Sequence, residues 1–353
     1  MVKTDRTGPA ADRTAAGPTA AAAFDELDLR LIHALQVDGR APFSRIAEVL
    51  GVSDQTVARR YGRHRGSGAL RVLGLSEPRA LGAVEWLVRV QCAPDAALPV
   101  AQALARRPDT SWVSLMSGGT EISAICRTAG SEDGDALLLQ KLPRTPSVVG
   151  VTAHCLLHEF YGGPQNVISK SGALAAEQIA ALSPPPAQVR ATPWVLSDAD
   201  RRLFDVLARD GRAPLAELAT ATGWSPTTVR RRLEALRADG VLYYDVDYDL
   251  RQCGFGVVVA LWLSVAPAEL AAAGEALAAH PEVAFAGAIT GPHNLFASLL
   301  CRDTGELYRY LTTRVAALPG VRTMESAPRI RHIKGAGPFL AAAPTALAAR
   351  SRR

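Results

Sequence analysis

The stretch 197–236 places apolar residues with the period of an α-helix, and this pattern predicts three consecutive helices. Ser197 precedes the first helix and Pro214 starts the second. Gly223 then provides a tight turn, and Ser225 is a residue type that caps the free amides at the start of a helix. Helix, glycine-containing turn and helix form a helix-turn-helix unit. The residues expected to face inward are Leu203, Phe204, Leu207, Leu215, Leu218, Ala219, Trp224, Val229, Leu233 and Leu236.

The third predicted helix, residues 225–236, carries its polar residues on the face opposite the apolar stripe. Short hydroxyl side chains and arginines on such a face suit contacts to phosphates and base edges of DNA. A solvated charged face is the alternative interpretation of the arginine run. A strand at residues 242–246 follows as a candidate wing. We expect DNA contacts from Ser225, Thr227, Thr228, Arg230, Arg231 and Arg232.

The chain repeats itself. Asp-Gly-Arg-Ala-Pro at residues 38–42 recurs at residues 210–214, an offset of 172 (210 − 38), and Gly118 corresponds to Gly291 at an offset of 173 (291 − 118). The offset indicates a tandem duplication of a unit of roughly 150 residues, far longer than a solenoid repeat. The two copies are joined by residues 161–193, where the run 183–186 reads Ser-Pro-Pro-Pro and favours an extended chain.

The first copy repeats the helix-turn-helix pattern between residues 24 and 75 with a weaker third helix. Gly62 lies in the middle of that helix, where glycine costs about 1 kcal/mol relative to alanine. We therefore expect a shorter and softer helix than in the second copy, with His64 as a packing residue. The candidate DNA contacts here are Ser53, Gln55, Thr56, Arg59, Arg60 and Arg63, and the residues that correspond to Thr227, Thr228 and Arg231 are Gln55, Thr56 and Arg59.

A second part follows in each copy and alternates strand and helix patterns in the order β-α-β-β-α-β, the ferredoxin-like unit. One sheet face of such a unit lacks helices, so we expect the two copies to cover each other. The predicted segments are 84–92, 98–107, 110–116, 122–127, 135–142 and 148–157 in copy one, and 257–265, 269–279, 283–289, 295–301, 305–318 and 321–333 in copy two. The fold class is α+β, with two winged helix-turn-helix domains, each followed by a ferredoxin-like domain.

The loop between the second and third strands of each sheet is a candidate effector site. A glycine lets backbone amides approach a small ligand, and the polar residues after it suit an amine or a carboxylate. A tight hairpin without any ligand is the alternative. The candidate effector residues are Gly118, Gly119, Thr120 and Glu121 in copy one, and Gly291, His293 and Asn294 in copy two.

Composition restricts the other functions. The net charge of +5 over 353 residues is only mildly basic, and no run of about 18 apolar residues predicts a membrane span. Five widely spaced cysteines favour reduced thiols in a cytoplasmic protein. His154 and His158 share one face of a predicted strand while Cys155 faces away, so we expect no metal site. No phosphate-binding or nucleophile motif predicts a cofactor or catalytic residues.

Together these features resemble the Lrp/AsnC family of bacterial and archaeal transcription regulators, over residues 24–160 and again over 194–335. The resemblance implies sheet domains that dimerise and bind an amino acid or related small molecule, through a Gly-x-x-Asp loop. Here Glu121 and Asn294 replace that Asp, which puts the usual amino-acid effector in doubt. The residues that carry the resemblance are Leu196, Asp200, Asp210, Gly211, Arg212, Leu218, Ala219, Ser225, Thr228, Val229, Arg231, Arg232, Leu233, Leu236 and Gly240.

The resulting hypothesis is a cytoplasmic, sequence-specific regulator that binds double-stranded DNA as an intrachain pseudo-dimer, assembles into homo-oligomers and responds to a small molecule. A siroheme-decarboxylase-like enzyme of the same architecture is the alternative. Residues 245–255 argue against it, because they are acidic and lack the histidines those enzymes carry after the wing. The expected domains are a disordered leader at 1–23, helix-turn-helix domains at 24–75 and 194–248, ferredoxin-like domains at 82–160 and 254–335, a linker at 161–193 and a tail at 336–353.

Overall fold

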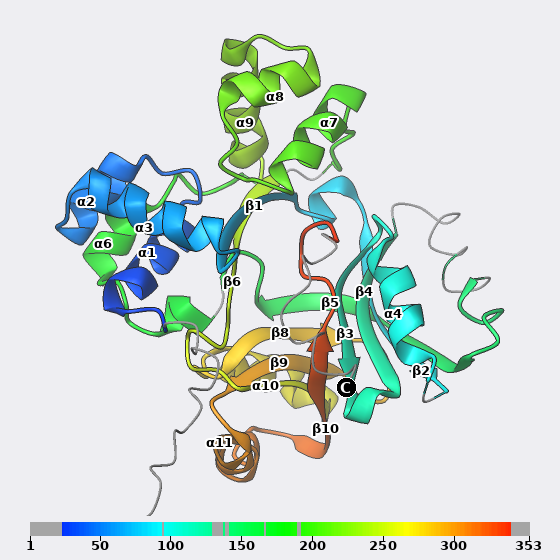
Figure 1. Ribbon diagram of the computed structural model, residues 1–353. Helices are drawn as coiled ribbons and strands as arrows, with labels where there is room; N and C mark the ends of the chain where they lie inside the picture. Colours follow the sequence, from blue (N-terminus) through cyan, green and yellow to red (C-terminus); the bar gives the residue numbers. More distant parts are fainter. Residues whose placement is uncertain are drawn as a thin grey trace, which may run out of the picture.

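The computed structural model describes residues 23–93, 95–128, 137, 141–165, 167–188 and 192–339 (Figure 1). Nearly all of the leader and most of the tail lie outside these ranges, as does most of the helix expected at 135–142. No helix in the described part of the chain is long and apolar enough to cross a membrane. Within the same ranges, no group of three or more His, Cys, Asp and Glu side chains is placed to hold a metal ion.

Each copy begins with three short helices that pack as a helix-turn-helix domain. In copy one they are α1 (Glu26–Val37), α2 (Phe43–Leu50) and α3 (Asp54–Gly66), and in copy two α7 (Asp198–Leu207), α8 (Leu215–Thr222) and α9 (Pro226–Ala238). Both turns contain a glycine in the left-handed conformation, Gly51 and Gly223, because it lets the chain reverse without a Cβ clash.

The expectation that α3 is shorter than α9 is wrong, because both helices span 13 residues. Tyr61 and His64 are buried where α9 has Leu233 and Leu236, so the apolar stripe is replaced rather than lost. Gly62 is exposed, and a Cβ there would meet no other atom. The glycine therefore leaves the packed face of α3 intact, and His64 is confirmed as a buried packing residue.

The strand after each helix-turn-helix domain pairs with its counterpart in the other copy. β1 (Leu70–Ser76) and β6 (Leu242–Tyr248) form an antiparallel two-stranded sheet, with Leu70 opposite Tyr248 and Ser76 opposite Leu242. We call this sheet the ribbon. The expectation of a wing within copy two is therefore wrong, because its strand β6 pairs with β1 of copy one. In Figure 1 the ribbon lies between the two helical domains and the barrel.

The two ferredoxin-like units close into one barrel of strand order β10-β3-β4-β2-β5-β8-β9-β7. The long strands β5 and β10 make the closure, since β5 pairs first with β2 and then with β8, and β10 first with β7 and then with β3. The mutual covering of the two sheets is therefore confirmed. The strands are β2 (Val84–Cys92), β3 (Thr110–Met116), β4 (Glu121–Thr128), β5 (Val148–Tyr161), β7 (Val257–Val265), β8 (Val283–Ile289), β9 (Leu295–Cys301) and β10 (Val321–His332).

Helices pack on the outside of the barrel and bury one side of each strand. They are α4 (Ala97–Ala105), α10 (Leu270–Ala278) and α11 (Thr304–Tyr310), the last continued by a π-helical turn over Leu311–Val315. Alternate residues of a strand face opposite sides. Leu295, Ala297 and Leu299 therefore join the helix-facing core, while Phe296 joins a separate apolar cluster with Leu87, Met116 and Trp262.

The linker also packs against a helical domain. A 3₁₀ turn (Val167–Lys170) is followed by α6 (Ala176–Leu182), and Leu182 is buried in the core around α1 and α2. The side-chain amide of Gln178 donates to the Val49 carbonyl oxygen at 2.7 Å. The linker thus contributes a helix to the core of the first helical domain.

Candidate nucleic-acid interface

Both third helices begin with the same capping geometry. The Ser225 hydroxyl oxygen accepts a hydrogen bond from the Thr228 amide at 3.2 Å and lies 2.9 Å from the Thr228 hydroxyl oxygen. Ser53 and Thr56 repeat this arrangement at the same two distances. Because the cap fixes the first turn, the polar residues that follow it are presented on a defined helical face.

The exposed face of each third helix holds most of the predicted DNA-contacting residues. Arg59, Arg230 and Arg231 are exposed, and among the described residues none of them enters an ion pair. Free guanidinium groups at these positions are available to an external anion. The exposed members of the predicted set are Ser53, Gln55, Arg59, Arg63, Ser225, Thr227, Arg230 and Arg231, and the half-buried threonines Thr56 and Thr228 lie beside them.

Arg232 differs from the sequence-based expectation, because it does not point outward. Its guanidinium makes two hydrogen bonds to the carboxylate of Asp200 on α7, at 2.7 and 2.8 Å, and stacks over the ring of Trp194 at 4.7 Å. Asp200 is fully buried. Burial acts to raise the pKa of Asp200, but the hydrogen bonds from Arg232 and Ser197 outweigh it and lower that pKa. Arg232 therefore ties α9 to α7.

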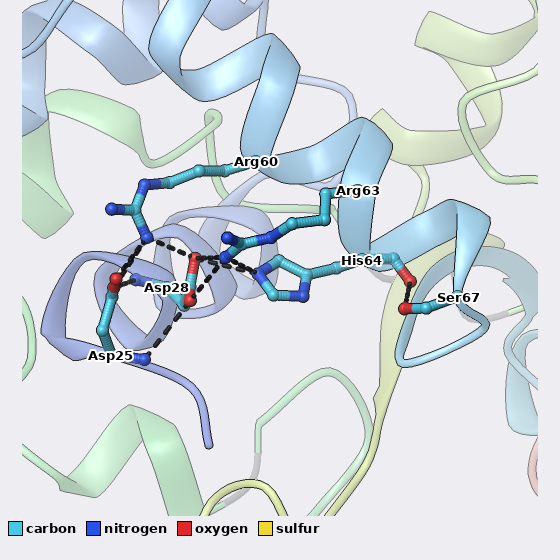
Figure 2. A network of polar contacts seen from close by, with 6 residues as sticks. All are labelled: Asp25, Asp28, Arg60, Arg63, His64 and Ser67. Carbon is cyan, nitrogen blue, oxygen red and sulfur yellow. Dashed lines mark hydrogen bonds and ion pairs between the residues drawn. The ribbon is translucent and has the colours of Figure 1, made fainter. Parts of the chain in front are cut away.

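Arg60, the counterpart of Arg232, also departs from the expectation of an outward side chain. Its guanidinium points toward Asp25 and Asp28 (Figure 2). It donates to Asp25 and to the buried Asp28 at 2.6–2.8 Å. Asp28 has two further partners, the Arg63 guanidinium at 3.1 Å and His64 Nε2 at 2.9 Å. Burial favours a higher pKa for Asp25, but the bond from Arg60 lowers it. Copy one thus surrounds its buried carboxylate with three basic side chains, whereas copy two relies on one arginine.

The two helical domains are also joined through their Asp-Gly-Arg loops. Arg40 donates to the carbonyl oxygens of Gly211 and Ala213 at 2.8 and 3.0 Å. Arg212 makes the reciprocal bonds to Gly39 and Ala41 at 2.7 and 3.0 Å. With the ribbon, this exchange fixes the position of one helix-turn-helix domain relative to the other. The sequence repeat identified both loops, but their pairing depends on the duplicated fold.

In the first effector loop the glycines have open space beside them, whereas the acidic residue is buried and paired. Gly118 and Gly119 have φ angles of 77° and 93°, and a Cβ at either would meet open space. Glu121 is 7% exposed. Its carboxylate accepts two hydrogen bonds from Arg89, at 2.8 and 3.0 Å, and Arg89 also binds Glu325 of copy two. The acid expected to meet an amine is therefore already paired within the chain.

The second effector loop is occupied by its own neighbours. The Asn294 side chain accepts from the Val265 amide at 2.8 Å and donates to the Val265 carbonyl oxygen at 2.9 Å. Gly291 lies against His154, and His293 lies 4.0 Å from Glu325. Sequence reasoning missed Arg89, although a charged residue in the apolar strand 84–92 was a signal that it needed a partner.

Comparison with known proteins assigns these domains. A model of the AsnC-type helix-turn-helix domain matches residues 24–63 and 196–237, and a model of the Lrp/AsnC ligand binding domain matches residues 258–339. An uncharacterized HTH-type transcriptional regulator of Pyrococcus abyssi is 30% identical over 132 residues, covering 37% of this chain and 84% of that protein. The chain belongs to the Lrp/AsnC family of transcriptional regulators. Within the Lrp/AsnC family it is a tandem duplication, because two helix-turn-helix segments match.

Two further comparisons place this Lrp/AsnC protein. The HTH-type transcriptional regulator LrpA of Pyrococcus abyssi is 25% identical over 128 residues, covering 36% of this chain and 91% of that protein. Among solved structures, the siroheme decarboxylase NirDL superimposes with a TM-score of 0.61 and 16% identity, over 90% of this chain and 95% of that chain. At this identity the likeness shows a shared fold along nearly the whole chain.

Proposed function

We propose that this Lrp/AsnC protein binds double-stranded DNA sequence-specifically and regulates transcription. The observation that carries the proposal is the pair of serine-capped helices α3 and α9, each with an unpaired arginine on its exposed face. A capped helix with this face suits the major groove. The residues proposed to contact bases are Thr227, Thr228 and Arg231 in copy two, and their counterparts Gln55, Thr56 and Arg59 in copy one.

The operator is expected to be asymmetric. Arg231 corresponds to Arg59, but Arg230 corresponds to Ala58. At these two positions α9 therefore presents two free arginines and α3 presents one. Selection of bound sequences from random duplex DNA tests this. We expect two unequal half-sites at one fixed spacing, with the stronger preference in the half bound by α9. A palindrome with equal half-sites contradicts the proposal, as does binding without sequence preference.

The decisive variant is Arg231→Ala. Loss of one base contact weakens specific binding by about 1–3 kcal/mol, roughly 5- to 160-fold. Arg201→Ala is the matched control, because Arg201 is an exposed arginine of the same domain on α7. Mobility shift at two salt concentrations separates phosphate neutralisation, which changes the salt slope, from base recognition. Equal affinity of both variants and the parent protein contradicts the assignment of Arg231.

We also propose that an amino acid or a related small molecule acts on the protein through the ferredoxin-like domains, and that pseudo-dimers assemble into homo-oligomers. The open glycines at 118 and 119 support the first loop as a contact point more than the second loop, whose polar side chains are already paired. Thermal shift against the amino acids, with light scattering for oligomer size, tests both parts. The enzyme alternative is tested by incubation with siroheme and mass spectrometry, in which we expect no decarboxylated product.

A further inference from the structure

The barrel is hollow below the ribbon. A cavity of about 510 Å³, which we call the lumen, is lined by side chains from all eight barrel strands and from β6. The strand β9 shows that these are inward-facing positions. Phe296, Ser298 and Leu300 line the lumen, whereas Leu295, Ala297 and Leu299 face the outer helices.

Several of the residues that line the lumen are small. An eight-stranded barrel is just wide enough to be filled by side chains or to hold one small ligand. Here Ser123, Ala260 and Ser298 line the wall, and Leu87 and Phe296 add apolar surface from a buried cluster. A volume of 510 Å³ lies within the range of known small-molecule pockets.

One wall of the lumen is acidic. Glu159 on β5, Asp245 on β6 and Glu77 beside the ribbon all line it, and none of the three forms an ion pair within the described ranges. Burial, together with nearby Glu77 and Glu85, raises the pKa of Glu159 to about 6. Burial and Asp247 raise the pKa of Asp245 to about 7. Arg79 acts in the opposite direction on the pKa of Glu77 and Glu159, and Arg127 on that of Glu77, but among the described residues neither arginine forms an ion pair with these carboxylates.

The opposite wall carries a cationic side chain, Arg329. Arg329 and His332 lie on β10, which is four strands from β5 in either direction around the closed ring of eight. Within the described part of the chain, the Arg329 guanidinium has no hydrogen-bond or ion-pair partner, and burial lowers its pKa to about 10. His332 Nδ1 lies 3.4 Å from the Ser114 hydroxyl oxygen. Burial and the nearby Arg329 lower the pKa of His332 to about 4, so the imidazole is neutral at pH 7. Arg329 is therefore the charge that faces the carboxylates across the lumen.

Unpaired ionic groups in a protein interior cost free energy, and opposite charges held apart cannot compensate each other directly. A molecule that carries both charges pairs both walls at once. An α-amino acid has its amine and carboxylate on one carbon, which is too close to span opposite strands of the barrel. The complementary ligand has a cation and a carboxylate separated by several atoms, with an apolar body between them for Leu87 and Phe296.

We propose that the lumen binds a dipolar small molecule of the short-peptide or ω-amino-acid class, with its amine against Glu159 and Asp245 and its carboxylate against Arg329. The site is separate from the strand two–three loops. It concerns binding alone, so it stands or fails independently of whether the chain binds DNA.

The test uses the full chain with Leu-Phe, Phe-Leu and 8-aminooctanoate as probes, in isothermal titration calorimetry. Quenching of Trp112, which lines the lumen and is 46% exposed, reports the location of binding. The Trp112→Phe variant identifies its signal among the tryptophans. We expect binding of at least one probe, and at least tenfold weaker binding of its N-acetylated or C-amidated form.

The variants Arg329→Met and Glu159→Gln each remove one wall's charge, and each is expected to weaken the probe at least tenfold. Glu159→Gln should fold at least as well as the parent, because it removes a buried acid without an ion-pair partner. Thermal unfolding checks this. Failure of all three probes to bind overturns the proposal, as does binding that neither variant changes or that leaves Trp112 fluorescence unaltered.

Discussion

Arg231→Ala and Arg232→Ala are adjacent substitutions in α9 with opposite expected consequences. Arg232 makes two hydrogen bonds of 2.7 and 2.8 Å to Asp200, which is fully buried, whereas Arg231 is exposed and enters no ion pair among the described residues. Removing one partner of a buried pair costs about 3–5 kcal/mol, because it leaves a buried charge uncompensated.

The expected loss for Arg232→Ala is somewhat smaller than that range, about 2–4 kcal/mol. Two contacts to the Asp200 carboxylate remain after truncation, from the Ser197 amide at 3.0 Å and the Ser197 hydroxyl at 2.7 Å. A loss of this size is a large fraction of the stability of a small domain. Arg231→Ala removes no intramolecular bond, so its effect on folding is expected to stay within about 0.5 kcal/mol.

Hydrogen exchange with peptide-level mass spectrometry is the suitable assay, because a chain of several domains does not unfold as one two-state unit. Arg232→Ala should speed exchange in α7 and α9 and leave the barrel strands unchanged. Copy one supplies the comparison: Arg60→Ala should have a smaller effect on α1 and α3, because Arg63 and His64 still bind Asp28. Unchanged protection of α7 in Arg232→Ala, or equal exchange in Arg231→Ala and Arg232→Ala, would refute the reasoning.

Three further outcomes are expected. Arg212→Ala should destabilise the protein by about 2–4 kcal/mol in urea unfolding, and Arg40→Ala by less. Both arginines bind two carbonyl oxygens, but of the two only Arg212 also stacks on a ring of the described residues, that of Phe43. Equal losses would exclude the stacking contribution. Asp245 has a pKa raised to about 7, so it destabilises the fold increasingly between about pH 4, where an unfolded aspartate ionises, and pH 7, and by a constant amount above that. Asp245→Asn should therefore stabilise the protein by up to about 4 kcal/mol at pH 8.5 and progressively less toward pH 4, and a gain that does not vary with pH argues against the assignment. Gly118→Ala should lower the free energy of unfolding by about 1–2 kcal/mol, because only its φ of 77° is unfavourable. Gly291→Ala also places a Cβ 2.5 Å from an imidazole nitrogen of His154, so it should lower the unfolding temperature more than Gly118→Ala does.

The barrel strands could be predicted because alternation of apolar and polar residues is a local property. The segments 84–92, 110–116, 257–265, 283–289 and 295–301 have the same bounds in the sequence prediction and in the structure. The two helical domains could be predicted equally well, from the residues that cap their helices and form their turns. The expected wing was wrong because a strand's sequence does not state its partner, and β6 pairs with a strand more than 160 residues earlier in the chain.

The candidate sites were less predictable, because a charged residue in a sequence does not reveal whether its charge is used inside the fold. Arg231 and Arg232 are neighbours of the same type, and only the structure shows that Asp200, 32 positions earlier, takes the second. Glu121 was placed correctly in its loop, but it is paired to Arg89, which also binds Glu325, 236 positions after Arg89 in the sequence. Such partners follow from closure of the barrel and not from any local pattern.

Covalent fusion explains why some contacts between the two copies use different residues on the two sides. In a dimer of identical chains, one residue must serve both sides of the pseudo-two-fold axis, whereas a duplicated chain is free to place different residues there. Arg89 and its counterpart Trp262 use this freedom, since the Arg89 guanidinium stacks 4.7 Å from the Trp262 ring. Their neighbours differ in parallel, with Glu121 paired to Arg89 and its counterpart Asn294 bonded to the backbone. A symmetric interface with arginine at both positions would bring two like charges together, so the asymmetry is itself a means of burying this contact.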